Sequence, residues 1–196
     1  MRRITRPAGD AGVTMIEVVV AMTVTAVFMA MFTGGVLLMF RSANRTQAVS
    51  TAQSDVNTAF LRLDTEIRYA AGISAPGIVS DDTYVEYVTL NTGTPLCTEL
   101  RLDVATRQLQ RRTWIRGSSP LTPTSWLPMA SNVSSAQPFT FTPPDDTFTF
   151  QRLELDVTSD GGGTAATRQT DVTFTAMNTS LSTPSDNGCA NGRSIP

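Results

Sequence analysis

The stretch from Val13 to Phe40 reads VTMIEVVVAMTVTAVFMAMFTGGVLLMF, and Glu17 is its only charged residue. As an α-helix this stretch reaches about 42 Å at 1.5 Å per residue, whereas the hydrocarbon core of a bilayer is about 30 Å thick. The sequence therefore predicts a membrane-spanning helix over residues 13–40 with one carboxylate near its start.

Glu17 needs a physical explanation, because a charge inside a membrane helix costs about 2.5–3.5 kcal/mol on insertion scales. Either the carboxylate lies among the lipid headgroups, where it costs little, or it has a function inside the membrane. The surrounding residues favour a function. Three arginines (Arg2, Arg3 and Arg6) precede a run of small residues, and Gly12-Val13-Thr14-Met15-Ile16-Glu17 follows.

This motif, with a short basic leader before it and an apolar stretch after it, resembles the cleavage and methylation site of type IV prepilins. The resemblance implies that a membrane aspartyl peptidase, the prepilin peptidase, cuts between Gly12 and Val13 and methylates the new amino terminus at Val13. It also implies that Glu17 pairs with the first-residue amine of a neighbouring subunit, so that two buried charges offset each other's desolvation. The family most often has Phe after the cut, where this chain has Val13.

Residues 1–12 are then a leader peptide and not part of the fold. An ordinary signal peptide cut after Val24-Thr25-Ala26 is an alternative, but Glu17 would interrupt its apolar core. Three arginines precede the span and two, Arg41 and Arg45, follow it closely. This imbalance favours a single-pass membrane protein with a cytoplasmic amino terminus and an extracytoplasmic carboxy-terminal domain.

An amphipathic stripe is expected to continue the helix over residues 41–72. Its apolar positions recur every three or four residues: Val49, Ala52, Val56, Phe60, Leu63, Ile67 and Ala70. Gly72 is a C-cap signal, with Arg68 in the last turn and Pro76 beyond it. The stripe could form a coiled coil, but its short length and the strands that follow favour docking on a sheet.

Gly34-Gly35 lies inside this predicted helix of roughly 60 residues, which would be about 90 Å long. The glycine pair has two interpretations, and the sequence does not favour either of them. It is either a kink point or a place where small residues allow close helix packing.

Residues 73–196 are rich in Thr, Ser, Pro and Gly and contain short alternating runs typical of strands. The expected strands are Tyr84–Leu90, Leu100–Val104 and Leu109–Arg116 (a hairpin), Leu153–Val157 and Val172–Ala176. The prolines of 120–144 predict mostly loop with strand residues at Phe139 and Phe141, and Gly161-Gly162-Gly163 predicts a turn. Strands after one long helix predict an α+β fold, a helix on an antiparallel sheet, similar to the larger minor pilins and pseudopilins.

Cys97 and Cys189 are the only cysteines. Because the domain is expected on an oxidising side of the membrane, we expect them to pair. Such a bridge would fix the polar carboxy-terminal tail to the sheet.

Five arginines crowd the predicted hairpin beside Trp114: Arg101, Arg107, Arg111, Arg112 and Arg116. Arg111, Arg112 and Arg116 could grip DNA phosphates while Trp114 stacks on a base. The alternative, which we favour, is a solvated strand face whose arginines mask a sheet edge. The formal net charge of −2, which becomes −4 without residues 1–12 (12 basic and 16 acidic side chains remain), also argues against nucleic acid.

Catalytic and metal sites have little support in the composition. The chain has no His and no Lys, which excludes histidine bases, histidine metal ligands and Schiff-base lysines. Asp81-Asp82 and Asp145-Asp146 lack the ligand spacing of a calcium loop, and two thiols do not make a zinc site. We therefore expect neither a metal nor any other cofactor, and a membrane enzyme is a remote alternative.

The sequence thus predicts a structural subunit, a minor pilin or pseudopilin, of a type IV pilus, a type II secretion system or a competence filament. Its expected partners are the prepilin peptidase, other pilin subunits, a membrane assembly platform and lipid. The alternative function is a DNA-binding receptor subunit of a DNA-uptake pilus. The sequence does not distinguish twitching, secretion and DNA uptake.

Overall fold

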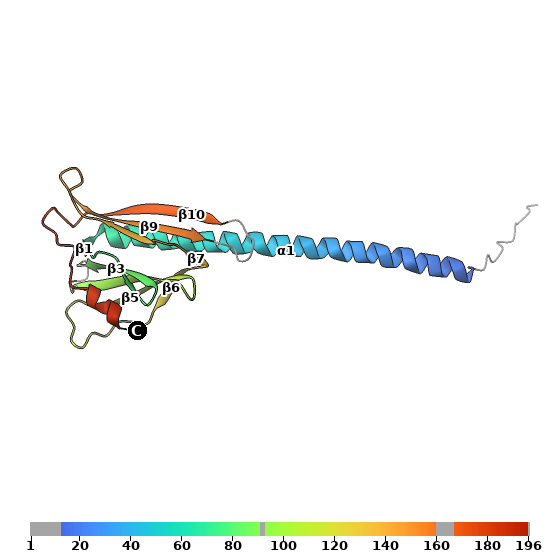
Figure 1. The fold of residues 1–196 in the computed structure, drawn as a ribbon, viewed down its shortest axis with the longest axis horizontal. Coiled ribbons are helices and arrows are strands. Elements are labelled where there is room, and N and C mark those ends of the chain that lie inside the picture. Colours follow the sequence, from blue (N-terminus) through green and yellow to red (C-terminus); the bar gives the residue numbers. More distant parts are fainter. Residues whose placement is uncertain (1–12, 91–92, 160–166, 196) are drawn as a thin grey trace, which may run out of the picture. The chain divides into compact units, whose positions relative to one another are not determined.

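A computed structural model describes residues 13–90, 93–159 and 167–195 (Figure 1). The expected leader peptide, residues 1–12, and the turn expected at Gly161-Gly162-Gly163 lie outside these residues. The chain divides into two compact units, residues 1–44 and residues 45–196. The division falls close to the boundary expected at residue 40, and the amphipathic half of the helix belongs to the same unit as the strands.

Helix α1 runs from Met15 to Arg68, 54 residues without a break. It passes through Gly34 and Gly35, and a Cβ added at either glycine would meet nothing within 4 Å. The hydroxyl groups of Thr23 and Thr25 donate to the carbonyl oxygens of Val20 and Ala21, at 2.8 and 2.7 Å. These bonds satisfy the polar groups within an otherwise apolar helix.

The helix ends at Arg68, so the end expected at Gly72 is wrong. Ala70–Ile73 form strand β1, which pairs with strand β3 (Asp82–Thr89), and Gly72 lies opposite Val88. The backbone N–H of Met177 donates to the Arg68 carbonyl at 3.0 Å and so satisfies one of the carbonyl groups at the end of the helix. Strand pairing therefore replaces the last expected turn of helix.

The larger sheet has six antiparallel strands among the described residues. Besides β1 they are β2 (Gly77–Val79), β3 (Asp82–Thr89), β4 (Leu96–Asp103), β5 (Gln108–Ile115) and β6 (Leu127–Ser131). The order is β1-β3-β4-β5-β6, and β2 also pairs with β3. The hairpin expected between residues 100 and 116 is present, with Arg107 in the left-handed region at its turn (φ 56°).

The smaller sheet has four antiparallel strands among the described residues: β7 (Val133–Ser134), β8 (Phe139–Thr142), β9 (Gln151–Ser159) and β10 (Arg168–Ala176). Both β7 and β8 pair with β9, and β10 pairs with β9 on its other side. The expected antiparallel sheet is thus two sheets, and 120–144 contributes three short strands to them.

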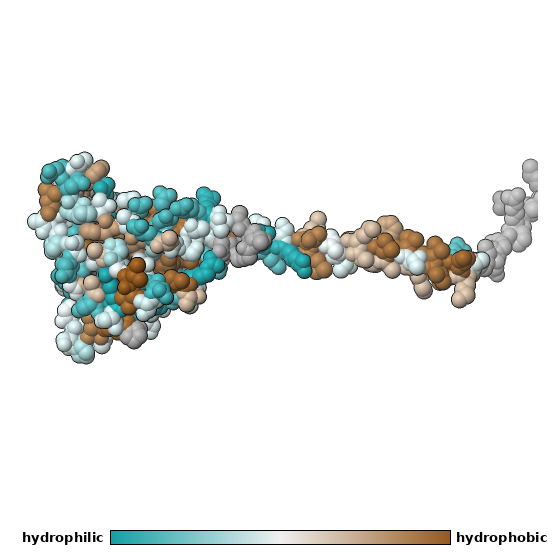
Figure 2. Space-filling view, viewed as in Figure 1, coloured by the Kyte–Doolittle hydropathy of each residue, from teal (hydrophilic) through white to brown (hydrophobic). Residues whose placement is uncertain are grey.

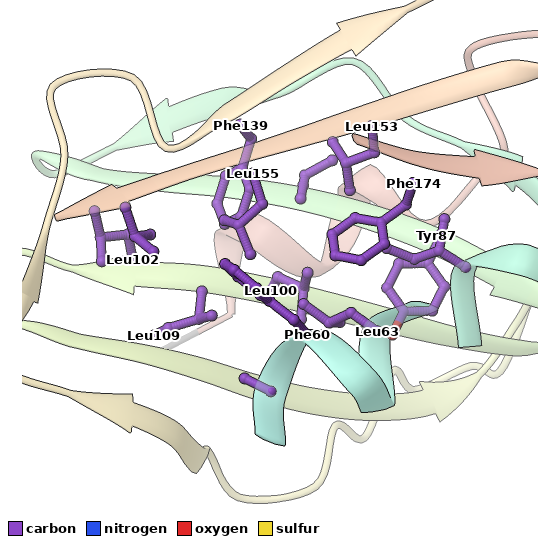
Figure 3. Close-up of a cluster of buried hydrophobic side chains, with 14 of the residues drawn as sticks. Phe60, Leu63, Tyr87, Leu100, Leu102, Leu109, Phe139, Leu153, Leu155 and Phe174 are labelled. Atoms are coloured by element: carbon purple, nitrogen blue, oxygen red, sulfur yellow. The ribbon is translucent and has the colours of Figure 1, made fainter. Parts of the chain in front are cut away.

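One core joins the carboxy-terminal part of α1 to both sheets (Figure 3). The buried helix residues follow the predicted stripe: Ala52, Val56, Ala59, Phe60, Leu63 and Ile67. Phe60 meets Phe174 of β10 edge to face, with ring centroids 6.2 Å apart, and Leu100 of β4 belongs to the same cluster. The stripe therefore docks on sheets as expected, and the fold is α+β.

Candidate functional site

The residues of the amino-terminal motif lie at the start of α1. Val13 and Thr14 precede the helix, and the backbone N–H groups of Glu17 and Val18 donate to the Thr14 carbonyl at 3.0 and 3.3 Å. Glu17 is the acid of the first turn, where the helix dipole favours a negative charge. Gly12 lies outside the described residues, so the structure gives one side of the expected scissile bond.

A shallow groove runs along the helix beside Glu17. Its residues recur at helical spacing: Val13, Glu17, Val18, Ala21, Met22, Thr25, Ala26 and Met29. Three of them (Ala21, Thr25 and Ala26) are small, and small residues allow another helix to approach closely. The groove therefore places an acid at one end of a surface suited to helix packing.

The first half of α1 exposes large apolar side chains around its circumference. Figure 2 shows one face of it, which is largely brown. Phe28 is 68% exposed, Phe32 70% and Met39 76%. This is the helix of the described residues that is long and apolar enough to cross a membrane. A surface of this kind requires lipid or other helices around it.

The hairpin arginines do not form a free basic face. Arg111 points to the inner face of the larger sheet, where its Nη2 lies 3.0 Å from Oε2 of Glu66 on α1. Arg112 points to the outer face, is 2% exposed, and its Nε lies 2.5 Å from Oε2 of Glu99 on β4. Arg116 is exposed just beyond β5.

The interpretation of these arginines as an edge mask is also wrong. β5 pairs with β4 on one side and β6 on the other, so it is an inner strand. Because consecutive residues of a strand face opposite sides, Arg111 and Arg112 bind carboxylates in two different layers. Neither is placed to contact a phosphate, and this arrangement does not favour the DNA-binding alternative.

Glu66 is a contact between α1 and the larger sheet that the sequence analysis did not identify. Its carboxylate accepts hydrogen bonds from the Tyr87 hydroxyl at 2.6 Å, from Arg62 at 2.9 Å and from Arg111 at 3.0 Å. Burial raises the pKa of Glu66, but these donors outweigh burial and hold the pKa below its ordinary value. Burial and the facing Glu66 carboxylate raise the pKa of Tyr87.

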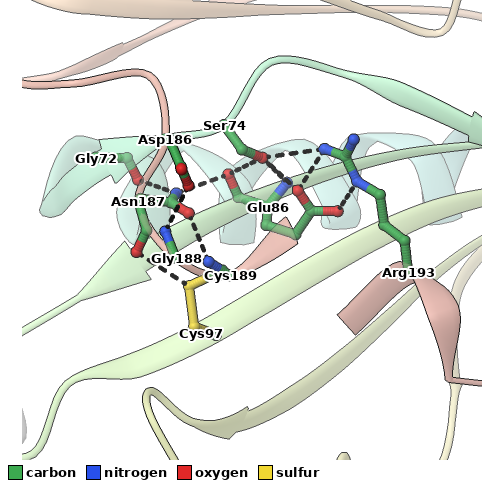
Figure 4. Close-up of a disulfide and its surroundings, with 9 residues drawn as sticks. All are labelled: Gly72, Ser74, Glu86, Cys97, Asp186, Asn187, Gly188, Cys189 and Arg193. Carbon is green, nitrogen blue, oxygen red and sulfur yellow. Dashed lines mark hydrogen bonds and ion pairs between the residues drawn. A yellow bond between two sulfur atoms is a disulfide. The ribbon is translucent and has the colours of Figure 1, made fainter. Parts of the chain in front are cut away.

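The outer face of the larger sheet is covered by the carboxy-terminal tail. Cys97 of β4 and Cys189 of the tail form a disulfide, with their Cα atoms 5.7 Å apart (Figure 4). The tail then forms a 3-10 helix, η1 (Ala190–Ser194). The Asn187 side-chain amide donates to the Gly72 carbonyl at 3.1 Å and so joins the tail to β1.

Two buried carboxylates lie under this tail, Glu86 of β3 and Glu99 of β4, both 0% exposed. Arg193 of η1 donates to both oxygens of Glu86, at 2.6 and 2.5 Å. Burial raises the pKa of Glu99 to about 7, although the hydrogen bond and the charge of Arg112 act against the shift. Among the residues that the structure describes, the Oε1 atom of Glu99 has no hydrogen-bond partner.

The acidic pairs considered for calcium serve local structure. Oδ1 of Asp82 accepts from the backbone N–H of Val104 at 2.9 Å, and Oδ1 of Asp145 accepts from those of Thr147 and Phe148. Asp81 lies in the β2–β3 turn with φ 74°. Within the part of the chain that the structure describes, no group of three His, Cys, Asp or Glu side chains could hold a metal ion.

Residues 8–33 match the family model described as the prokaryotic N-terminal methylation motif. The matched range contains Gly12, Val13 and Glu17, and together with the long apolar helix it fits a type IV prepilin-like protein. Comparison with curated proteins and with solved structures gives no match. The motif implies processing by prepilin peptidase, assembly with other pilins and anchoring in a membrane.

Proposed function

We propose that this chain is a structural subunit of a type IV filament system, a minor pilin or pseudopilin, and not an enzyme. The observation that carries the proposal is the match to the methylation motif over residues 8–33, followed at once by an exposed apolar helix. The domain that follows that helix in sequence, with ten strands among its described residues, favours a minor subunit over the abundant one, because much of the chain is devoted to it.

Processing begins the proposed pathway. Prepilin peptidase cuts between Gly12 and Val13 and methylates the amine of Val13. Before assembly the chain spans the cell membrane once, with its amino terminus in the cytoplasm and the domain of both sheets outside it. A membrane assembly platform then transfers the processed chain into a filament at the cell surface.

Glu17 is proposed to pair with the Val13 amine of a neighbouring subunit. Cleavage creates a protonatable amine that needs a partner in lipid, and an uncompensated buried charge costs about 3–5 kcal/mol. The groove beside Glu17 supports this role, since Ala21 and Thr25 leave room for the start of another helix.

Substitution of Glu17 tests the proposal. Glu17→Val should leave cleavage and membrane insertion intact, because it makes the span more apolar, while incorporation into sheared filaments should fall steeply. Glu17→Gln is the variant that tests charge alone, since it keeps the size of the side chain and one hydrogen-bond acceptor. Its incorporation into sheared filaments should fall in the same way. Immunoblots of the filament and membrane fractions measure how much of each variant enters filaments. Normal incorporation of both variants would place Glu17 at the headgroups and reject the charge pair.

A further inference from the structure

The outer face of the larger sheet carries two rows of buried side chains that run across three strands. The strand registers place Glu86, Glu99 and Arg112 opposite one another in one row. They place Val88, Cys97 and Trp114 in the next row. All six are between 0% and 3% exposed, although the smaller sheet packs on the opposite face, where Leu100 lies.

The tail covers part of both rows, beside Trp126, whose ring centroid lies 4.1 Å from Cζ of Arg112, and Leu121, which packs on the second row. Arg112 donates to the carbonyl oxygens of Gly192 and Ile195, at 2.9 and 2.6 Å. A Cβ added at Gly192 would overlap the Trp114 ring, so the tail backbone lies directly on the indole. Figure 4 shows Arg193 reaching from η1 to the Glu86 carboxylate beside the disulfide.

The two carboxylates of the first row have different guanidinium partners. Arg112 of the sheet pairs with Glu99, whereas the partner of Glu86 is Arg193 of the tail. Arg193 also donates to the Ala75 carbonyl at 2.6 Å. The tail is thus recognised by charge and by main-chain hydrogen bonds in a row separate from the sulfur atoms.

We propose that the Glu86–Arg193 ion pair and the Arg112–carbonyl bonds dock the tail on the sheet before the disulfide forms, and so deliver Cys189 to Cys97. The two cysteines are 92 residues apart, and chance encounter of the ends of so long a loop is entropically costly. Docking replaces that encounter with a high effective concentration of one thiol at the other. This inference does not depend on the proposed filament function.

The oxidation itself is thiol–disulfide exchange with an external disulfide. The thiolate of one cysteine attacks the external disulfide, forms a mixed disulfide and releases one thiol. The thiolate of the second cysteine then displaces the other thiol and closes the Cys97–Cys189 bond. Two electrons pass to the external disulfide, which ends as two thiols and takes up the two protons.

Reoxidation of the reduced full-length chain in detergent tests the order of events. The chain is reduced with dithiothreitol under native conditions, mixed with oxidised glutathione, quenched with iodoacetamide at intervals and weighed by mass spectrometry. Arg193→Gln should slow closure of the disulfide about tenfold. Gly77→Ala should slow it as well without changing any charge, because a Cβ at residue 77 would overlap the Arg193 guanidinium.

Two controls make the outcome decisive. Asp64→Asn removes an exposed carboxylate from the Asp64–Arg68 pair, away from the tail, and should reoxidise at the wild-type rate. Slow hydrogen exchange of β9 shows that a variant keeps its folded core. If Arg193→Gln does not keep its core, Gly77→Ala tests the docking proposal in its place. Wild-type reoxidation rates in folded Arg193→Gln or Gly77→Ala would overturn the proposal.

A second measurement removes the sulfur chemistry altogether. In Cys97→Ser/Cys189→Ser the amides of residues 187–195 should still exchange slowly, because the ion pair and the Arg112 bonds remain. When Arg193→Gln is added to this variant, the amides of residues 187–195 should exchange fast. A tail that exchanges freely in the double-serine variant would show that the disulfide alone holds it, which contradicts the proposal.

Discussion

Loss of the Glu66 carboxylate should loosen the attachment of α1 to the larger sheet. Glu66 is 22% exposed in its side chain, and two of its three donors belong to the sheet: Tyr87, which is fully buried, and Arg111, which is 12% exposed. Arg62 is 52% exposed and contributes little. Hydrogen bonds to a charged group contribute about 1.5–3 kcal/mol each, and a glutamine can still accept one of them. We therefore expect Glu66→Gln to lower the free energy of unfolding by about 2 kcal/mol.

Urea unfolding of the full-length chain in detergent, followed by tryptophan fluorescence, measures this loss. A double-mutant cycle of Glu66→Gln with Tyr87→Phe should give a coupling energy of about 1 kcal/mol, because both substitutions remove the same 2.6 Å hydrogen bond. Asp64→Asn, on the solvent side of the same helix turn, should leave the unfolding midpoint unchanged.

The loss should also depend on pH, because the pKa of Glu66 is lowered in the folded state. A lowered pKa adds stability that is fully present above the ordinary value of 4.5 and disappears as the pH falls through the folded-state value. The free energies of unfolding of wild type and Glu66→Gln should therefore become equal in acid. An unfolding midpoint of Glu66→Gln equal to that of wild type at pH 7 would refute the reasoning.

Three further predictions concern other parts of the chain. Leu63→Ala, at a side chain that is 0% exposed, should cost about 2–5 kcal/mol in the same unfolding assay, whereas Leu61→Ala, at a side chain that is 74% exposed, should cost little; equal losses would contradict the observed helix orientation. Burial raises the pKa of Glu99 from 4.5 to about 7, so stability should fall as the pH rises between these values, and Glu99→Gln should remove that slope; a slope retained in the variant would assign it to another group. Gly12→Val should block processing by crowding the scissile bond, and mass spectrometry of the membrane-extracted chain should find the amino terminus at Met1 in the variant and at Val13 in the wild type; a wild-type amino terminus at Val27 would indicate an ordinary signal peptide.

The long helix and most of the strands could be predicted because their signals are local. The apolar run, the stripe through Phe60 and Leu63, and the alternation of Leu100 and Leu102 each lie within a few residues of one another. The helix end could not be located in this way. Gly72 is a good cap by sequence, but pairing of β1 with β3 decides that residues 70–73 are a strand.

The roles of the charged residues could not be predicted because they depend on register and on the tail. Alternation marks Glu99 and Arg101 as outward-facing, which in an isolated sheet would mean solvated. The structure buries Glu99 because Arg112 of the neighbouring strand and Arg193 of the distant tail complete its layer. By sequence alone, the five arginines between residues 101 and 116 therefore indicate a solvated face that masks an edge, with a DNA-binding surface as the alternative. The fold instead pairs Arg101, Arg111 and Arg112 with its own carboxylates.

Late covering of the larger sheet has a consequence for export in the proposed topology. There the strands that carry Glu86, Glu99 and Arg112 would leave the membrane well before the tail that covers them, since Cys189 follows Cys97 by 92 residues. During that interval the row of charged side chains lies beside the apolar row of Val88, Cys97 and Trp114, keeps the uncovered face wetted and discourages its association with other partly folded chains. An apolar face in the same position would have been an aggregation hazard until the tail arrived. The row of charged side chains thus keeps this face of the sheet soluble until the tail docks on it.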